Sequence, residues 1–181
     1  ITTLGTSHGD PTASRFQSST LVESGGRSYL IDAGEPVTGL MVRSGKALSA
    51  LRAVFITHMH EDHVGGLPDL IKMLVKHAGG RVGVGVFLPD AGAVAALGGW
   101  LQAMYVPWPS PAVSVQGYAG PGRIYDDGVL AVTAIPTRHL GHAGRPSNAL
   151  ELRLEGRRVV ATGDLRSDAA DFPVRAGDEP C

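Results

Sequence analysis

An apolar, β-rich run in the middle of the chain gives way abruptly to a polar segment and then to a helical pattern. Residues 51–57 (LRAVFIT) are rich in β-branched and aromatic side chains, as in a buried strand. Beyond the polar residues 58–66, apolar side chains recur at positions 67, 70, 71, 74 and 75, the spacing of one helix face. The sequence therefore predicts a strand that leads into a helix through a short polar loop.

Short β-branched runs separated by glycine predict most of the other elements. A two-glycine turn joins predicted strands over residues 19–23 and 27–31, and a Glu-Gly turn joins residues 149–154 to 157–162. An acidic residue follows each hairpin, Asp32 in one case and Asp164 in the other. Two similar β-rich halves with helices outside predict a sheet-on-sheet core. Further strands are expected over residues 1–4, 82–88, 112–116 and 129–135, with a second helix over residues 91–105.

The composition excludes several classes of protein. The chain has 16 Lys and Arg against 17 Asp and Glu, so its formal charge of −1 argues against a polybasic binder of nucleic acids or membrane surfaces. No apolar stretch reaches the roughly 18–20 residues that a membrane span needs. The only cysteine is Cys181, which excludes an intrachain disulfide and a thiolate metal cluster. We expect a soluble, cytoplasmic protein whose metals, if any, are held by His, Asp or Glu.

Three histidines and an aspartate fall within residues 58–63 (HMHEDH). Alternating side chains of an extended segment point the same way, so His58 and His60 can converge on one ion. Asp62 and His63 follow where the chain starts to coil and can face a second ion nearby. Imidazole and carboxylate ligands suit zinc, and also manganese or iron. The alternative is a polar loop in which Asp62 caps a helix, but four ionisable groups this close are costly without a cation.

This segment, His58-x-His60-x-Asp62-His63 followed by two glycines, resembles the signature of the metallo-β-lactamase fold superfamily. The resemblance is to the ribonuclease Z-like and phosphodiesterase-like branch, and it extends through GTSHGDP (5–11), YLIDAG (29–34), GGLPDL (65–70), His139 and ATGDL (161–165). It implies an α+β chain folded as a four-layer αββα sandwich, with a binuclear metal site at one edge of the two sheets. Residues 1–181 would form a single domain, with halves of about 1–111 and 112–181.

The resemblance also implies which residues bind metal. The first ion would be held by His58, His60 and His139. The second would be held by Asp62, His63 and Asp164, with Asp164 bridging both ions. Asp32 would orient one of the ligands, as carboxylates beside metal sites commonly do.

Three further histidines are candidates for the site. His139 is preferred to His142 as a ligand because it follows the predicted strand 129–135 more directly. His142 would then lie near the substrate or face solvent. His8, in the loop after the first strand, could contact substrate or could stabilise its own turn.

The sequence departs from the family pattern in two ways. The family's last ligand histidine normally follows the Asp164 segment, but none of the seven histidines lies beyond His142. We therefore expect that the closing strand and helix are missing, and that the chain is part of a longer polypeptide or is completed by another chain or a second copy. No inserted basic arm of the kind found in ribonuclease Z enzymes that process transfer RNA is visible, so transfer RNA is a disfavoured substrate.

These observations predict a metal-dependent hydrolase acting on a small phosphodiester or ester. Two divalent ions, most simply zinc, would generate a metal-bridged hydroxide as the nucleophile. Asp62 would help to orient this nucleophile, Asp164 would bridge the ions, and His142 or His8 would donate a proton or hydrogen bond to the substrate. The alternatives are a lactone, thioester or amide hydrolase with the same centre, a non-catalytic metal-binding module with an incomplete site, and a histidine cluster that only stabilises the fold.

Overall fold

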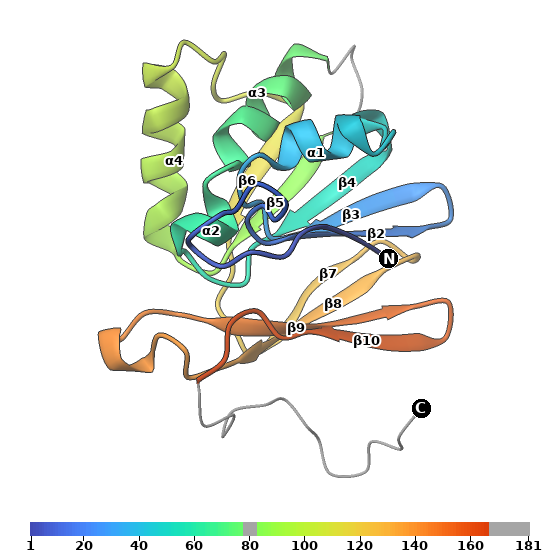
Figure 1. Cartoon of the computed structure of the whole chain (residues 1–181), viewed down its shortest axis with the longest axis vertical. Helices are drawn as coiled ribbons and strands as arrows, with labels where there is room; N and C mark the ends of the chain where they lie inside the picture. The colour runs from blue at the N-terminus through green and yellow to red at the C-terminus, as the bar shows by residue number, and fades with distance from the viewer. Residues whose placement is uncertain (78–82, 167–181) are drawn as a thin grey trace. The chain divides into compact units, whose positions relative to one another are not determined.

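The strands of the computed structural model form two separate sheets (Figure 1). The structure describes residues 1–77 and 83–166. A six-stranded sheet belongs to a unit formed by residues 1–119, and a four-stranded sheet belongs to a second unit that starts at residue 120. Within the described residues, no helix is both long and apolar enough to cross a membrane. Cys181 lies outside the described residues.

The six-stranded sheet of the first unit is mixed, with the strand order β1-β2-β3-β4-β5-β6. Its first three strands run antiparallel, whereas β3 to β6 run parallel to one another. The strands are β1 (Thr2–Gly5), β2 (Ser19–Ser24), β3 (Arg27–Ile31), β4 (Leu51–Phe55), β5 (Val84–Leu88) and β6 (Val113–Gly117). Because β3 and β4 are parallel neighbours in this sheet, their carboxyl ends meet at one edge, where ligands bind in sheets of this kind.

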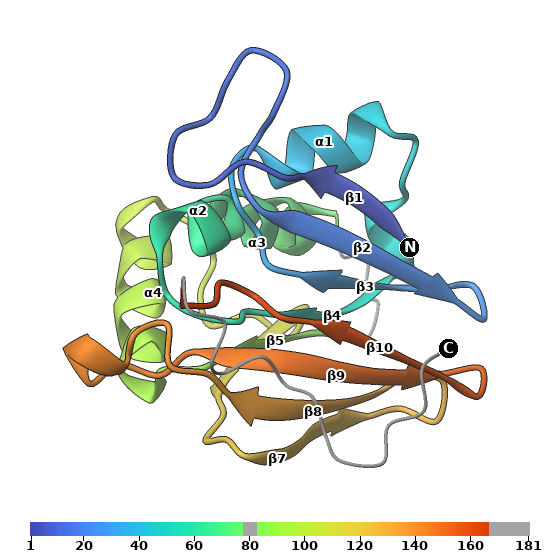
Figure 2. The same ribbon diagram turned by 60° about the horizontal axis from the view of Figure 1, so that its bottom comes forward.

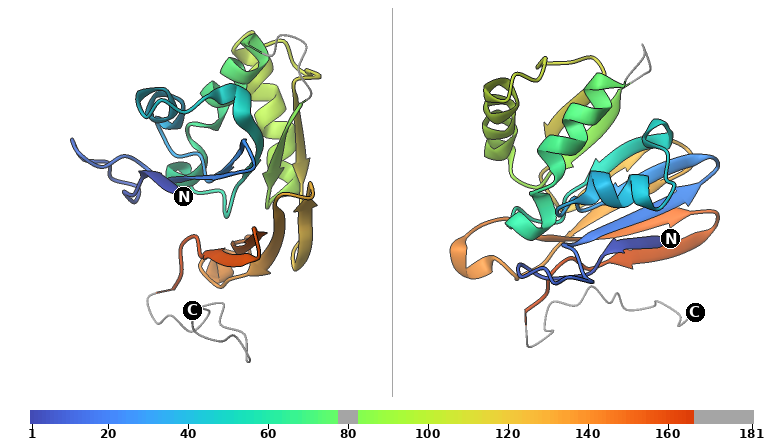
Figure 3. Two further views of the ribbon diagram at one scale, coloured as in Figure 1. Left: turned by 90° about the vertical axis from the view of Figure 1, so that its right-hand side faces the viewer. Right: turned by 45° about the horizontal axis from the view of Figure 1, so that its top comes forward.

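Helices pack on this sheet through a continuous apolar core. They are α1 (Val37–Arg43), α2 (Glu61–Val64), α3 (Leu67–Lys76) and α4 (Ala91–Ala103), with a 3₁₀ turn, η1, at Leu48–Ala50. The predicted apolar face of α3 is buried, and Leu67, Leu70 and Ile71 are fully inaccessible. They join sheet residues such as Val54 and Val86 in one cluster. Figure 3 shows α3 and α4 lying side by side above the strands of this unit.

The second unit is an antiparallel sheet with the order β10-β9-β8-β7 (Figure 2). Its strands are β7 (Gly122–Asp126), β8 (Ala131–Pro136), β9 (Asn148–Leu154) and β10 (Arg157–Ala161), with a 3₁₀ turn, η2, at Gly141–Ala143. The sequence did not predict β7, which alternates weakly and carries Arg123 and Asp126. The turn after it forms because the Asp127 carboxylate accepts hydrogen bonds from the N–H groups of Val129 and Leu130.

The two predicted hairpins are confirmed, and their turns are alike. Gly25 and Gly26 connect β2 to β3 with φ of 56° and 72°. Glu155 and Gly156 connect β9 to β10 with φ of 50° and 71°. Positive φ at both central residues gives a two-residue turn whose twist matches that of the strands. Asp32 and Asp164 follow the second strand of each hairpin, as the sequence comparison of the two halves indicated.

Candidate metal centre

The histidine-rich segment leaves the carboxyl end of β4 and enters α2. Thr57 and His58 are almost completely buried, whereas His60 is exposed and Asp62 and His63 are buried again. Backbone hydrogen bonds fix this segment against the end of β3: Ala33 N donates to His63 O at 2.7 Å, and Gly66 N donates to Ala33 O at 2.8 Å. The YLIDAG motif (29–34) and the start of the GGLPDL motif (65–70) are therefore joined by backbone hydrogen bonds.

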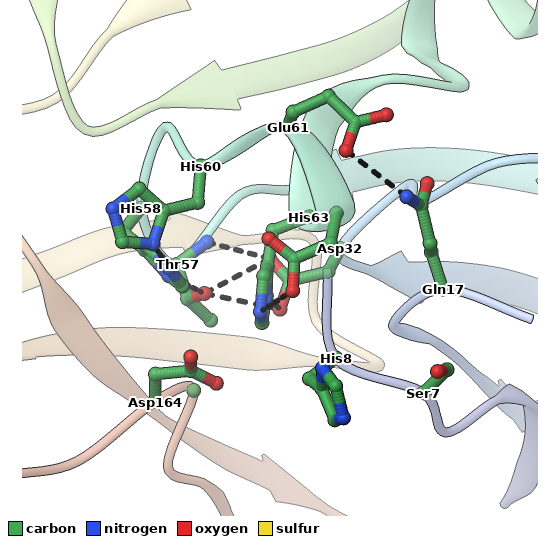
Figure 4. Close-up of polar contacts among 12 residues, drawn as sticks. Ser7, His8, Gln17, Asp32, Thr57, His58, His60, Glu61, His63 and Asp164 are labelled. Carbon is green, nitrogen blue, oxygen red and sulfur yellow. Dashed lines mark hydrogen bonds and ion pairs between the residues drawn. The ribbon is translucent and has the colours of Figure 1, made fainter. Parts of the chain in front are cut away.

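His58 and His60 turn their ring nitrogens toward each other (Figure 4). Nε2 of His58 lies 3.1 Å from Nδ1 of His60, and the two rings meet edge to face. The alternating positions expected from the extended segment do bring these two imidazoles together. Two imidazole nitrogens at this separation can bind a single cation together.

Asp62 and His63 form a second pair on the first turn of α2. Nε2 of His63 lies 3.6 Å from Oδ2 of Asp62. The ring of His63 also lies against that of His58, with centroids 4.1 Å apart. All four side chains of the HMHEDH segment that were predicted as ligands are thus gathered at one edge of the first sheet.

Asp32 is the centre of the hydrogen-bond network beneath these histidines (Figure 4). Its Oδ2 lies 2.7 Å from Nδ1 of His63, and its Oδ1 accepts from the Thr57 backbone N–H at 2.8 Å. The Thr57 hydroxyl lies 3.0 Å from both carboxylate oxygens. Burial raises the pKa of Asp32 above its ordinary value, although the contacts with His63 and Thr57 partly oppose that effect.

With Asp32 ionised, this network selects one tautomer for each of two imidazoles. An ionised Asp32 can only accept hydrogen bonds, so His63 donates from Nδ1 and keeps the lone pair on Nε2. The Thr57 hydroxyl donates to Asp32 and can accept from Nδ1 of His58, 3.1 Å away. Both rings then carry their proton on Nδ1, and both Nε2 atoms remain available as ligands.

In the second unit, His139 and Asp164 lie close to each other. Nε2 of His139 is 3.7 Å from Oδ2 of Asp164. The loop that carries His139 is closed by Ser147, whose hydroxyl donates to the Thr137 carbonyl and accepts from the Thr137 hydroxyl. Nothing in the sequence pattern pointed to Ser147, because a single serine in a polar loop carries no periodicity.

His142 and His8 lie in two different loops. His142 lies in η2, and its side chain is outside the part of the chain that the structure describes. His8 is exposed, and its Nδ1 accepts from the Asp10 N–H at 3.3 Å. This contact is the turn-stabilising role that was one of the two alternatives for His8.

Comparison with known proteins places this chain in a family. The model of the metallo-beta-lactamase superfamily matches residues 13–177. Ribonuclease Z of Synechococcus sp. strain WH7803 is 41% identical over 144 residues, which are 77% of this chain and 44% of that protein. Ribonuclease Z of Mycobacterium sp. strain KMS is 42% identical over 71 residues, 39% of this chain and 25% of that protein. The chain thus spans less than half the length of these curated relatives.

Solved structures share the fold. Human tRNase Z, short form, superposes with a TM-score of 0.76 at 20% identity, and the match covers 92% of this chain and 71% of the human chain. The metallo-beta-lactamase fold protein YhfI from Bacillus subtilis has a TM-score of 0.71 at 20% identity, and the match covers 94% of this chain and 65% of YhfI. The predicted metallo-β-lactamase fold is therefore confirmed.

The expectation that disfavoured transfer RNA is wrong. The relatives with the matching sequence are named ribonuclease Z, and the human protein of similar fold is a tRNase Z. That expectation rested on a missing basic arm in a chain that spans under half of its relatives, and an absence of that kind says nothing about the substrate. By its sequence motifs, its two sheets and the match over residues 13–177, the chain belongs to the metallo-beta-lactamase superfamily and is similar in sequence to its ribonuclease Z members.

Proposed function

We propose that this chain forms the metal centre of a hydrolase that cleaves phosphodiester bonds in RNA. Membership of the superfamily supports a metal-dependent hydrolase, and the ribonuclease Z relatives support RNA as the class of substrate. The cytoplasmic location remains a prediction from the sequence.

The observation that carries the proposal is the spacing of the donor atoms in the first unit. Two nitrogen ligands of a tetrahedral zinc ion, each about 2.0–2.1 Å from the metal, lie about 3.3 Å apart. Nε2 of His58 and Nδ1 of His60 are separated by 3.1 Å, and Nε2 of His63 and Oδ2 of Asp62 by 3.6 Å. Both separations fit ligand pairs on divalent metal ions, so the residues present suit the group that the family uses.

The full ligand set is part of the proposal. His58, His60 and His139 would hold one ion, and Asp62, His63 and Asp164 the other, with Asp164 shared between them. Two ions and zinc as the metal are the simplest assignment for a set of imidazoles and carboxylates without thiolate. Three protein ligands with an open position are enough for a catalytic zinc ion.

Bound divalent ions would supply a Lewis acid that lowers the pKa of water and stabilises negative charge on the phosphoryl oxygens. The chain's own residues prepare that site. Asp32 holds the His63 ring through Nδ1 and leaves its Nε2 available as a ligand atom, and Thr57 does the same for His58. Asp62 would orient the attacking water, and His142 would protonate the oxygen that leaves phosphorus.

Turnover of a short RNA by the purified chain, measured with and without added zinc, tests this function. The wild-type chain is expected to release a cleaved product only with metal, whereas His60→Ala and Asp164→Ala should lose at least about a hundredfold in rate, since each removes a metal ligand. Ser14→Ala, on an exposed loop, is the matched control and should cleave like the wild type.

Two further substrates separate this function from the alternatives. An aryl phosphodiester should be cleaved with the same metal dependence, and a lactone should not. Cleavage of the lactone alone would replace the proposed function with that of a carbonyl hydrolase. No turnover of any substrate by a chain that binds two metal ions would identify a metal-binding module that lacks hydrolytic activity by itself.

A further inference from the structure

A buried glutamine joins the loop before β2 to the first residue of α2. Gln17 is 5% exposed, and both ends of its side-chain amide are hydrogen-bonded. Its Nε2 donates to Oε2 of Glu61 at 3.0 Å, and its Oε1 accepts from the Glu35 backbone N–H at 3.0 Å. Figure 4 shows this contact on the side of α2 that faces away from His58.

The backbone next to Gln17 repeats the same connection. Ser18 N donates to Asp62 O at 3.0 Å, and Gln17 N donates to Glu35 O at 3.3 Å. Gly34 is packed so closely that a Cβ there would lie 2.3 Å from Asp62 O and 2.7 Å from the Gln17 Cβ. Residues 17 and 18 thus hold the chain after β3 and the start of α2 together.

Glu61 stands between two proposed metal ligands, His60 before it and Asp62 after it. It is the first residue of a helix of only four residues, which has little stability of its own. A short helix of this kind keeps its orientation only through contacts with its surroundings. The contacts available to Glu61 therefore influence the direction in which both neighbouring ligands point.

We propose that Gln17 is a positioning residue of the metal centre: by holding the Glu61 carboxylate, it fixes the start of α2 and so the approach of His60 and Asp62 to the metal. This inference rests on the proposed function, since it assigns Gln17 a role in the same site. Gln17 donates to an ionised acceptor, and hydrogen bonds to charged groups are among the stronger ones in proteins.

A charge exchange between the two residues tests the proposal. Gln17→Glu places a second carboxylate about 3.0 Å from Glu61, so the two repel and the contact is lost. The double variant Gln17→Glu with Glu61→Gln restores the bond with donor and acceptor exchanged, and the Glu35 N–H keeps its acceptor. Gln17→Met, which removes both side-chain bonds at similar volume, is a second variant in case the repulsion prevents folding. Gln102→Glu, on the exposed side of α4, is the matched control.

Two measurements on the purified chain are made for each variant. Zinc affinity is measured by competition with a chelating dye, and hydrogen exchange is measured on the metal-free chain. Gln17→Glu and Gln17→Met are expected to weaken zinc binding about tenfold. This is the lower end of the loss in metal affinity that follows when a residue supporting the metal ligands is replaced. The amides of His63 and Gly65, which donate to His60 O and Glu61 O, should exchange faster. The double variant should recover both values, and Gln102→Glu should change neither.

The results separate this inference from the function on which it rests. Wild-type zinc affinity in Gln17→Glu and Gln17→Met, or failure of the double variant to recover it, would overturn the positioning role. A wild-type chain that binds no zinc would contradict the proposed function. In that case, unchanged amide hydrogen-exchange rates at His63 and Gly65 in the Gln17 variants would also show that the contact between Gln17 and Glu61 does not constrain α2.

Discussion

Nδ1 of His63 lies 2.7 Å from Oδ2 of Asp32, and both side chains are buried. The two residues are 31 positions apart in the sequence, and they meet because the parallel strands β3 and β4 end at the same edge of the sheet. A carboxylate buried behind an imidazole fixes the ring and its tautomer. This pair connects the fold of the first unit to the chemistry proposed for it.

Replacing Asp32 by Asn tests that connection. The amide is similar in size but carries no charge, so it no longer compels His63 to donate from Nδ1. Zinc affinity is expected to fall about 10- to 100-fold. Competition with a chelating dye measures the change. Asp69→Asn, at an exposed carboxylate paired with Lys72, should leave the affinity unaltered; an equal loss in both variants would argue against a specific role for Asp32.

Thr57 gives a second test, since its hydroxyl touches both Asp32 and His58. Thr57→Val keeps the shape but removes the hydroxyl. We expect a loss of about 1–2 kcal/mol in the free energy of unfolding and a weaker affinity for zinc, because buried polar groups lose a partner. Urea unfolding and dye competition provide the two values. Thr57→Ser keeps the hydroxyl and should stay close to the wild type in affinity; similar losses in the Ser and Val variants would contradict the argument.

Gly34→Ala tests how tightly the ligand loop is packed. A Cβ at this position would come within 2.3 Å of Asp62 O, which is backbone and cannot move aside. The variant should lose about 1–3 kcal/mol of stability or more, as overpacking does when the neighbouring atoms cannot move aside. Gly99→Ala is the matched control, since a Cβ on that exposed residue of α4 meets nothing within 4 Å. Thermal unfolding should show a lower midpoint for Gly34→Ala and an equal or slightly higher one for Gly99→Ala.

Glu151 predicts a pH dependence of stability in the second unit. Burial alone would raise the pKa of this carboxyl, but hydrogen bonds from Arg158 and Arg153, each at 2.9 Å, outweigh it and hold the pKa below its ordinary value. A lowered pKa in the folded state contributes stability that is complete above the unfolded value of about 4.3, and this stability is lost as the pH falls through the folded value.

The corresponding variant is Glu151→Gln. At pH 7 it should be less stable than the wild type by about 1–3 kcal/mol, because hydrogen bonds to a charged group are lost. The difference should shrink as the pH falls below about 4. Urea unfolding at several pH values gives the comparison, with Glu155→Gln on the exposed turn as the control. A difference that stays constant down to pH 3 would exclude Glu151 as its source.

Much of this fold follows from local patterns. The run 51–57, the apolar spacing of α3 and the two glycine-containing turns each specify one element, and all of them occur in the structure. The helix α1 was not predicted, because only seven residues form it and Gly39 interrupts its apolar pattern. Short elements of this kind are determined by the core they cover rather than by their own sequence.

The candidate site divides in the same way. The close approach of His58 to His60 follows from alternation along an extended segment, which is a local rule. The contacts of Gln17 with Glu61 and of Ser147 with Thr137 join segments that are distant in sequence or lie in irregular loops. No periodicity marks such residues, so only the folded chain reveals them.

Anomalous diffraction at the zinc absorption edge, from crystals of this chain grown with zinc, tests the central claim most directly. Two anomalous peaks are expected, one of them about 2.0–2.2 Å from Nε2 of His58 and Nδ1 of His60, and the other within the same range of Asp62 and His63. Zinc bound only at places remote from residues 58–63, in crystals where those side chains are well ordered, would contradict the account.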